Sequence, residues 1–519
     1  MSSYIYNAGS AFSEIAACFA SRPALVMLNG ATTTYRDLDD LSNRISLWLL
    51  REGVATGDVV AILNCKSVHA YACMIACLKV GVIYVNLDPS SPPERLGKML
   101  EACAPKQLWT FKNTLSQLTS LGDRLPRLVD YSDEVFWAEL ERMPSSFPKK
   151  NDHVHGACVA YIMFTSGSTG FPKGAAISHA NLLNFMAWGR TTFDVTPADR
   201  LTNLNPMHFD NSVFDFYTAL FSGASMVPVP EELLKNPRRM LDALNPMNCT
   251  VWFSVPSLIV YALRMRALRE VDFPSLRVMS FGGEGFPKGS LRALAKLIMP
   301  RVRLVNVYGP TECTCICSSY EVVQNDLAFD ELLPLGPVAP NFTYLIVNEE
   351  GALVADDEIG ELYLGGPNVG VGYYRNPEKS SEVFVQSPAQ ANYRDVYYRT
   401  GDLVRYDAKQ DLLFFCGRKD NQVKRMGYRI ELEEIENAIG SLSYVLENAV
   451  VFVRKIDDAG SIVAHVNASQ RDEVSLIDEL RKKLPPYMIP DKVVFSDSLP
   501  KNQNGKIDRI SIKNLELNS

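Results

Sequence analysis

The sequence lacks the long apolar runs, basic blocks and leader segment that mark membrane, nucleic-acid-binding and secreted proteins. No segment reaches the roughly 18 consecutive apolar residues that a membrane-spanning helix needs. The net charge is -7, without a cluster of lysines or arginines, which argues against nucleic acid or an anionic membrane as a partner. The first 28 residues contain no basic region followed by a long apolar stretch, so they predict no secretory signal.

Regularly spaced cysteines are also lacking. The chain has 11, an odd number, which fits reduced thiols and a cytoplasmic location better than a disulfide framework. Cys313, Cys315 and Cys317 would share one face of a strand, but no second Cys/His group follows, so we expect core residues rather than a metal site. His153 and His155 are likewise interpreted as part of a solvated loop.

Strand-like and helix-like segments alternate over the first 320 residues. Segments 67–80 and 288–299 have the apolar spacing of helices. The expected strands are 58–63, 82–87, 160–164, 225–229, 250–255, 276–281 and 303–308. Because these runs are continuously apolar and separated by helices, they predict parallel sheets covered on both faces, an α/β fold.

The pattern changes in the last third of the chain. Residues 335–415 read as hairpins around polar turns and predict an antiparallel, barrel-like subdomain. Beyond them, Ile435, Ala438, Ile439 and Leu442 form one helix face. Strands at 448–456, 461–467 and 492–496 and a helix at 474–484 complete a compact α+β unit. With 519 residues, we expect a large domain (1–419) of two α/β subdomains plus the barrel-like one, and a small domain (420–519).

The segment "TSGSTGFPKG" (165–174) follows a strand and carries the composition of an anion site. Glycines let the backbone approach a ligand closely, and successive N–H groups can form a nest for phosphate. The hydroxyl groups of the loop and the charge of Lys173 add donors. A Ser/Gly surface turn is the structural alternative, and a P-loop is excluded because no Gly-Lys-Ser/Thr follows.

Eight motifs, in order, resemble the adenylate-forming superfamily, which includes acyl-CoA synthetases, luciferases and the adenylation domains of nonribosomal peptide synthetases. They are "LKVGVIYVNLDPSSPPERL", "TSGSTGFPKG", "FDNSVFDFY", "NVYGPTE", "GELYLGGPNVGVGYY", "YRTGDLVRY", "GRKDNQVKRMGYRIELEEIE" and "PKNQNGKIDR". The resemblance implies that a carboxylate joins the α-phosphate of ATP, that pyrophosphate leaves, and that a carrier thiol attacks the acyl adenylate. Such chemistry depends on positioning and charge neutralisation.

The resemblance also assigns the nucleotide contacts. The loop would hold the β- and γ-phosphates through Thr165, Ser166, Gly167, Ser168, Thr169, Gly170 and Lys173. Tyr308 would stack on adenine, Thr311 would contact phosphate, and Glu312 would bind Mg²⁺, which prefers oxygen ligands. Asp402 would accept hydrogen bonds from the ribose, aided by Arg418. Further contacts are expected at Gly283, Glu284, Asn306 and Gly309, and His208 is expected to act with Thr311 and Glu312 in catalysis.

Lys506 and the small domain complete the expected mechanism. Lys506 follows the tight-turn dipeptide Asn504-Gly505, from which a point cation could neutralise both the substrate carboxylate and the α-phosphate. In relatives the small domain is mobile and adopts one orientation for each half-reaction, with the hinge at Asp420 and Gly427 near the thiol channel in the second. The sequence departs from its relatives at Arg425-Met426, where an aliphatic residue and then Arg are usual.

The motif "FDNS" indicates the kind of acid. In amino-acid-activating relatives the aspartate, here Asp210, pairs with the α-ammonium group, and a buried carboxylate without a cation would cost several kcal/mol. The remaining pocket positions carried over are Asn211, Phe214, Phe253, Met279, Phe281, Val307, Cys315 and Ile316, with Lys506 closing the set. This apolar lining predicts a small or medium apolar amino acid. Asn211 leaves a polar or β-amino acid open, and "SFGGEGFP" and "YRIELEEIE", which are similar to D-alanine–carrier protein ligases, leave D-alanine open.

The chain ends soon after Lys506, so we expect a free-standing, monomeric enzyme that loads a separate phosphopantetheinyl carrier protein. Two other functions stay open at this point. An acyl- or aryl-CoA ligase is disfavoured by Asp210. A non-catalytic nucleotide-binding protein is disfavoured by the joint presence of Glu312, Asp402 and Lys506.

Overall fold

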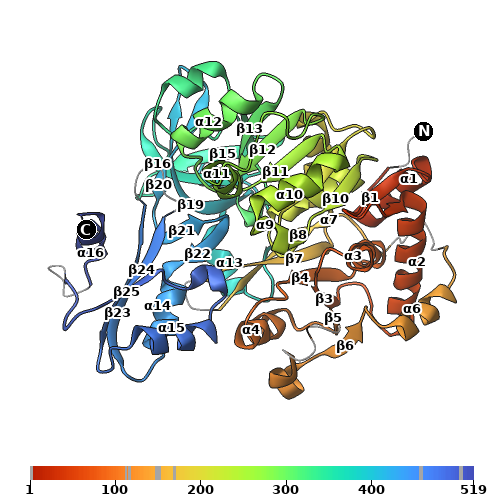
Figure 1. Cartoon of the computed structure of the whole chain (residues 1–519), viewed down its shortest axis with the longest axis horizontal. Helices are drawn as coiled ribbons and strands as arrows, with labels where there is room; N and C mark the ends of the chain where they lie inside the picture. Colours follow the sequence, from red (N-terminus) through yellow and green to blue (C-terminus); the bar gives the residue numbers. More distant parts are fainter. Residues whose placement is uncertain are drawn as a thin grey trace.

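The computed structural model describes residues 4–111, 114, 118–146, 153–167, 171–454, 460–501 and 507–518. Figure 1 shows the amino-terminal third of the chain at the right and a small carboxyl-terminal domain at the left. Within the described ranges, no helix combines the length and the hydropathy of a membrane span.

The first sheet has the strand order β17-β8-β7-β4-β3-β5-β6. Its five parallel strands are β3 (Val59–Leu63), β4 (Ile83–Leu87), β5 (Gln107–Thr110), β6 (Arg127–Asp130) and β7 (Val159–Thr165). The antiparallel edge consists of β8 (Lys173–Ser178) and β17 (Gly372–Tyr373). The serine-rich segment thus connects β7 to β8 at the carboxyl end of a central parallel strand.

The second sheet has the order β14-β13-β12-β11-β9-β10-β1-β2. Its parallel strands are β1 (Pro23–Val26), β9 (Arg200–Asn203), β10 (Ser225–Pro228), β11 (Val251–Ser254), β12 (Val278–Gly282) and β13 (Arg303–Tyr308), and its antiparallel edges are β2 (Thr32–Thr34) and β14 (Ser318–Glu321). The largest apolar cluster lies between the two sheets, since it joins Val60 and Tyr161 of the first to Val251 and Val305 of the second. Alternate residues such as Ala61 and Met279 enter separate clusters on the outer faces.

Helices cover both sheets. They are α1 (Ala8–Cys18), α2 (Tyr35–Arg51), α3 (Val68–Val80), α4 (Pro93–Cys103), α6 (Glu134–Glu141), α7 (His179–Thr192), α8 (Asn211–Val213), α9 (Glu231–Leu234), α10 (Pro237–Leu244), α11 (Pro256–Arg264), α12 (Lys288–Ile298) and α13 (Pro377–Val383). Reciprocal capping boxes, Thr34 with Asp37 and Ser178 with Asn181, fix the starts of α2 and α7. Helix α3 is buried from Ala70 to Val80, as its continuous apolar sequence requires.

An antiparallel sheet links the large domain to the small one. It contains β15 (Thr343–Val347), β16 (Ile359–Gly365), β18 (Phe384–Gln386), β19 (Val396–Asp407) and β20 (Leu412–Arg418). The sheet is open rather than closed into a barrel, and the long β19 is its central strand. One end of β19 pairs with β18 and the other end with β20. The predicted antiparallel hairpins are therefore confirmed.

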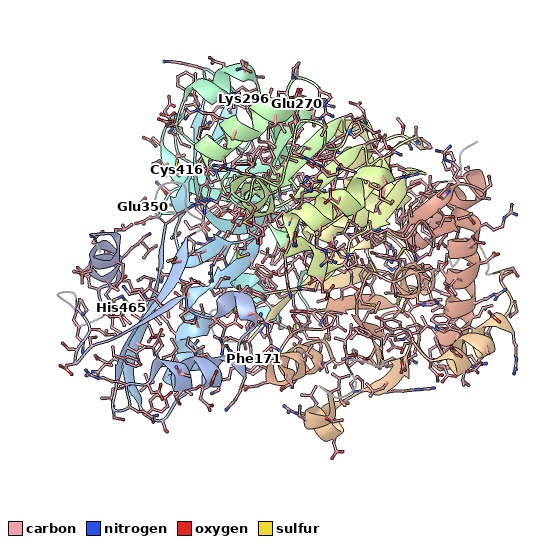
Figure 2. The ribbon with its side chains drawn as sticks, in the orientation of Figure 1. Phe171, Glu270, Lys296, Glu350, Cys416 and His465 are labelled. Atoms are coloured by element: carbon pink, nitrogen blue, oxygen red, sulfur yellow. The ribbon has the colours of Figure 1, made fainter. Side chains whose placement is uncertain are left out.

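The small domain contains a two-stranded hairpin and a three-stranded sheet. The hairpin consists of β21 (Gln422–Arg425) and β22 (Tyr428–Glu431), and the sheet of β23 (Val445–Val453), β24 (Ser461–Ala468) and β25 (Lys492–Phe495). The helices are α14 (Leu432–Gly440), α15 (Glu473–Arg481) and α16 (Arg509–Asn518). Figure 2 places His465 of β24 at the left of the molecule, in this domain, and Glu270 and Lys296 at the top. The domain boundary at residues 419 and 420 stays a prediction.

One local expectation was wrong. Residues 313–317 form no strand: Cys313 ends a short 3₁₀ helix (Thr311–Cys313), and Thr314 and Cys315 have positive φ angles of 60° and 76°. The chain turns here because the segment must return to β14 directly after β13. All three cysteines are buried and free, and no group of three or more His, Cys, Asp or Glu residues within the described ranges is placed to hold a metal ion.

Candidate active site

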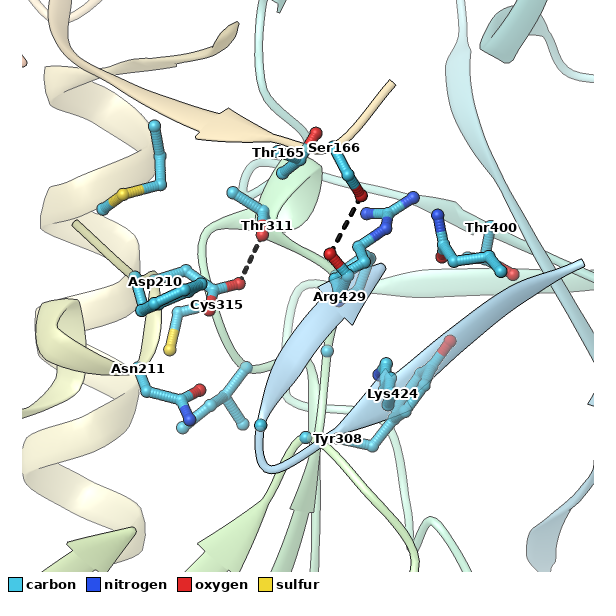
Figure 3. A pocket seen from close by; sticks show the side chains of 18 of the residues that line it. Thr165, Ser166, Asp210, Asn211, Tyr308, Thr311, Cys315, Thr400, Lys424 and Arg429 are labelled. Atoms are coloured by element: carbon cyan, nitrogen blue, oxygen red, sulfur yellow. Dashed lines mark hydrogen bonds between the residues drawn. The ribbon is translucent and has the colours of Figure 1, made fainter. Parts of the chain in front are cut away.

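A cavity lies where the carboxyl ends of β7, β11 and β13 meet the hairpin of the small domain, the usual position of a ligand site in open parallel sheets. Figure 3 shows it from close by. Residues expected from the sequence that line it are Thr165, Ser166, Asp210, Asn211, Phe253, Gly283, Val307, Tyr308, Gly309, Thr311, Cys315, Ile316, Asp402, Arg418 and Gly427. Segments more than 250 positions apart therefore meet in one cavity.

The serine-rich segment reaches the cavity at the end of β7. The Ser166 hydroxyl donates a hydrogen bond to the Arg429 carbonyl oxygen at 2.9 Å, and Lys173 Nζ lies 3.5 Å from a carboxylate oxygen of Glu431. A Cβ atom on Gly167 would lie 2.0 Å from the Phe171 carbonyl oxygen, so position 167 requires glycine. Ser168, Thr169 and Gly170 lie outside the described residues.

Tyr308, Asp402 and Arg418 form a connected group. The Tyr308 hydroxyl donates to Asp402 at 2.5 Å, and Arg418 donates to the other Asp402 oxygen, also at 2.5 Å. Arg418 makes two further hydrogen bonds of 2.6 Å to Asp420, so the expected ribose acceptor and the expected hinge residue share one guanidinium group. Lys424 Nζ lies 5.6 Å from the centroid of the Tyr308 ring.

Glu312 is fully buried and ionised. It accepts hydrogen bonds of 2.8 Å from the Tyr373 hydroxyl and from Arg429 Nη1. Burial opposes its ionisation, but Arg429, Lys173 and the Tyr373 hydroxyl outweigh burial and lower the pKa of Glu312 to about 2. An ionised carboxylate is a hard oxygen donor, which fits Mg²⁺.

Asp210 lines the cavity beside Thr311. The Thr311 hydroxyl donates to it at 2.6 Å, which joins the residue expected to bind the amino acid to the residue expected to contact phosphate. Burial raises the pKa of Asp210 above its usual value, and Thr311 and Lys424 counter that rise. Asn211 begins α8, which continues as a π-helical turn over Phe214–Thr218, a distortion frequent at functional sites.

Fewer residues line the cavity than the nine pocket positions that the family resemblance assigned. Phe214 does not line the cavity but packs behind Phe253, with ring centroids 5.1 Å apart. Met279 and Phe281 point to the other face of β12, where Phe281 packs against Phe286. Strand alternation explains this, since neighbours on β12 face opposite sides of the sheet.

Three other expected residues have structural partners. Glu284 accepts a hydrogen bond of 2.8 Å from the Ser257 N–H in the first turn of α11. Asn306 donates to the Pro334 carbonyl oxygen at 2.9 Å. Both line a second cavity, which opens between β13 and the small domain. His208 lies 3.9 Å from Asp88, and its ring packs at a tilt of 52° against the ring of Phe209.

The small domain contributes residues that sequence reasoning missed. Cross-strand pairing of Gln422 with Glu431 and of Lys424 with Arg429 places these four polar side chains on one face of the hairpin. Gln422, Lys424 and Arg429 line the cavity, and so do Arg95 and Tyr487. Alternation of polar and apolar residues in "QVKRMGYRIE" is the signal that could have identified this face.

Gly427 forms the tip of the hairpin, and its φ angle is 80°. A Cβ atom there would lie 2.3 Å from Val255, so the tip touches the large domain. Lys506 lies outside the described residues. Of its described flanks, Lys501 pairs with Glu447 at 2.7 Å and Ile507 packs in the core of the small domain.

Comparison with known proteins agrees with this geometry. Residues 12–374 match the family of AMP-binding enzymes, and residues 434–506 match the AMP-binding enzyme C-terminal domain. The chain belongs to the AMP-binding enzymes. It is 36% identical to an L-proline–[L-prolyl-carrier protein] ligase of Pseudomonas fluorescens, over 89% of each chain.

Two further relatives of this AMP-binding enzyme cover nearly all of it. A D-alanine–D-alanyl carrier protein ligase of Bacillus licheniformis is 34% identical over 92% of this chain and 94% of its own. The Vibrio cholerae adenylation domain AlmE, solved with glycyl-adenosine-5'-phosphate, superposes with a TM-score of 0.84 at 25% identity, over 100% of this chain and 99% of its own. The predicted fold and family are therefore confirmed, and ATP is a substrate of this enzyme.

Proposed function

We propose that this AMP-binding enzyme joins an amino acid to the α-phosphate of ATP, releases pyrophosphate, and transfers the aminoacyl group to the phosphopantetheine thiol of a separate carrier protein. The observation that carries the proposal is the Thr311–Asp210 hydrogen bond of 2.6 Å. It sets a carboxylate suited to an α-ammonium group directly beside the cavity that contains Tyr308 and Asp402. The names of the proline and D-alanine ligases support the same chemistry.

We propose the following roles for the residues of the site. Tyr308 would bind adenine, Asp402 with Arg418 the ribose, and the segment from Thr165 to Lys173 the outer phosphates. Glu312 would hold Mg²⁺, which when bound neutralises the leaving phosphates. Lys506 would reach the reacting carboxylate in the other orientation of the small domain, with Asp420 as the hinge. Contact of Gly427 with Val255 supports assigning the present orientation to thiol transfer.

The proposed substrate is a small or medium apolar amino acid. Phe253, Val307, Cys315 and Ile316 supply an apolar lining, and Phe214 fixes Phe253 from behind. Asn211 is the polar exception and keeps a β-amino acid among the substrates to be tested. One methylene group changes binding by only about 1–3 kcal/mol, so the lining narrows the class rather than selecting one acid.

Amino-acid-dependent exchange of labelled pyrophosphate into ATP tests the proposal. The panel should include L-proline, glycine, L- and D-alanine, L-valine, β-amino acids and aryl acids. We expect exchange with apolar amino acids and none with aryl acids. Thioester formation with coenzyme A, but not with a carrier protein, would show instead an acyl- or aryl-CoA ligase. Absence of exchange with every acid would favour a nucleotide-binding protein without catalytic activity.

A further inference from the structure

Strand β22 contacts three groups of the large domain at once. Arg429 pairs with Glu312 at 2.8 Å, and its carbonyl oxygen accepts the Ser166 hydroxyl hydrogen bond at 2.9 Å. Glu431 pairs with Lys173 at 3.5 Å. Figure 3 shows Arg429 reaching from β22 toward Ser166. These three groups are the ones to which the proposed function assigns the metal and the outer phosphates.

The signs of the charges match those of the proposed ligands. Arg429 presents a cation to Glu312, where a divalent cation would bind, and Glu431 presents an anion to Lys173, where a phosphate would bind. A buried carboxylate that already pairs with a guanidinium group cannot also contact a metal ion without bringing two cations together. Glu431 would likewise repel a phosphate at Lys173.

Other contacts fix the hairpin in this position. Gln422 Nε2 donates to Glu431 at 2.6 Å, which orients the carboxylate toward Lys173. Tyr428 stacks on Tyr487 with ring centroids 3.8 Å apart, and the edge of Phe209 packs against Tyr428 at 4.8 Å. The three charged and polar contacts of β22 therefore form or break together when the hairpin moves.

We propose that β22 imitates magnesium pyrophosphate: Arg429 takes the position of the metal and Glu431 that of a phosphate, so MgATP and the inserted hairpin exclude each other. Binding of MgATP expels the hairpin, and departure of magnesium pyrophosphate readmits it. The inference rests on the proposed function, because it takes Glu312, Lys173 and Ser166 as the groups that hold the triphosphate.

Isothermal titration of the full chain with MgATP and, separately, with AMP tests the inference. A protein whose competent state is only partly populated binds more weakly in proportion to that population. We therefore expect Arg429→Gln to bind MgATP at least about threefold more tightly than the wild type, with the AMP affinity unchanged because AMP lacks the outer phosphates. Arg429→Lys, which keeps the charge, should stay near the wild-type value.

Two more variants secure the result. Arg425→Gln removes the same charge from the same hairpin, but Arg425 pairs with Asp491 of the small domain and should leave the MgATP affinity unchanged. Glu431→Gln removes the contact with Lys173 and should strengthen MgATP binding even if Arg429→Gln fails to fold. Unchanged or weaker MgATP binding in both Arg429→Gln and Glu431→Gln would overturn the inference, whereas a wild type that binds no MgATP would contradict the proposed function itself.

Spin-label distances give a readout independent of affinity. Nitroxides at the exposed Glu270 (Figure 2) and Asp478 would report the domain orientation, after replacement of Cys18, Cys65, Cys158 and Cys416 by serine. MgATP should shift the wild-type distance distribution and AMP should not. Arg429→Gln should populate the shifted distance without nucleotide. If Arg429→Gln gave the same distance distributions as the wild type, both without nucleotide and with MgATP, β22 would not compete with the triphosphate.

Discussion

Asp210 is the residue to which the proposed function assigns recognition of the substrate's α-ammonium group. Burial raises the pKa of Asp210 above its usual value, and a nearby cation would favour the charged form. We expect Asp210→Asn to keep the hydrogen bond from Thr311 but to lose the ion pair with the substrate, which should raise the KM for the amino acid by about 100-fold or more. Amino-acid-dependent pyrophosphate exchange measures this, with the KM for ATP as the internal control. An unchanged KM for the amino acid would remove Asp210 from the substrate site.

A second prediction about a single residue concerns Lys506. Lys506→Ala should lower the rate of adenylate formation by about 100-fold or more, because the cation that neutralises the reacting oxygens is gone. Transfer from chemically prepared aminoacyl adenylate should be retained, since the present orientation presents the hairpin to the cavity instead. Equal loss of both half-reactions would mean that Lys506 acts on stability, which the unfolding midpoint would reveal.

Among the structural elements, the tip of the β21–β22 hairpin allows the clearest prediction. A methyl group at Gly427 would lie 2.3 Å from Val255 and would sit on a residue with a φ angle of 80°. Gly427→Ala should therefore slow thiol transfer at least tenfold while pyrophosphate exchange changes by less than about twofold. The double variant Gly427→Ala/Val255→Ala should recover part of the transfer rate. Equal transfer rates in the wild type and Gly427→Ala would show that thiol transfer does not require the hairpin tip to contact Val255.

Most elements could be predicted because their sequences satisfy local rules. Short, largely apolar runs such as 59–63 and 303–308 are strands buried on both faces, and the helix over Leu432–Gly440 has its apolar face where expected. The turn at Thr314 and Cys315 could not be predicted, since neither residue type signals a positive φ angle. The contacts of Arg429 with Glu312 were equally hidden, because they depend on how one domain is oriented against the other.

At the scale of the whole molecule, acid stability should depend on His179. Its Nδ1 atom accepts a hydrogen bond of 3.0 Å from the Ala8 N–H, which joins α7 to α1, and burial lowers the pKa of His179 to about 4. The unfolded chain takes up this proton near pH 6.5 and the folded chain only near 4, so stability is complete above 6.5 and falls as the pH decreases through that window.

Between pH 7.5 and 5 the loss from this group is about 2 kcal/mol. His179→Gln keeps an acceptor for Ala8 without a titrating group, so its urea-unfolding midpoint should fall less over the same range. Parallel decreases in both proteins would assign the acid sensitivity to other residues.

The two domains also share a buried ion pair between Arg95 of α4 and Glu434 of α14. If the small domain turns away as proposed, both groups recover their hydration, and the water they regain offsets much of the attraction they lose. A buried ion pair of this kind would therefore oppose separation of the domains less than an apolar contact of the same size. Replacing both side chains by methionine would remove the hydration gained on separation and favour the present orientation, so the variant should form the aminoacyl adenylate more slowly than the wild type from the first turnover onward.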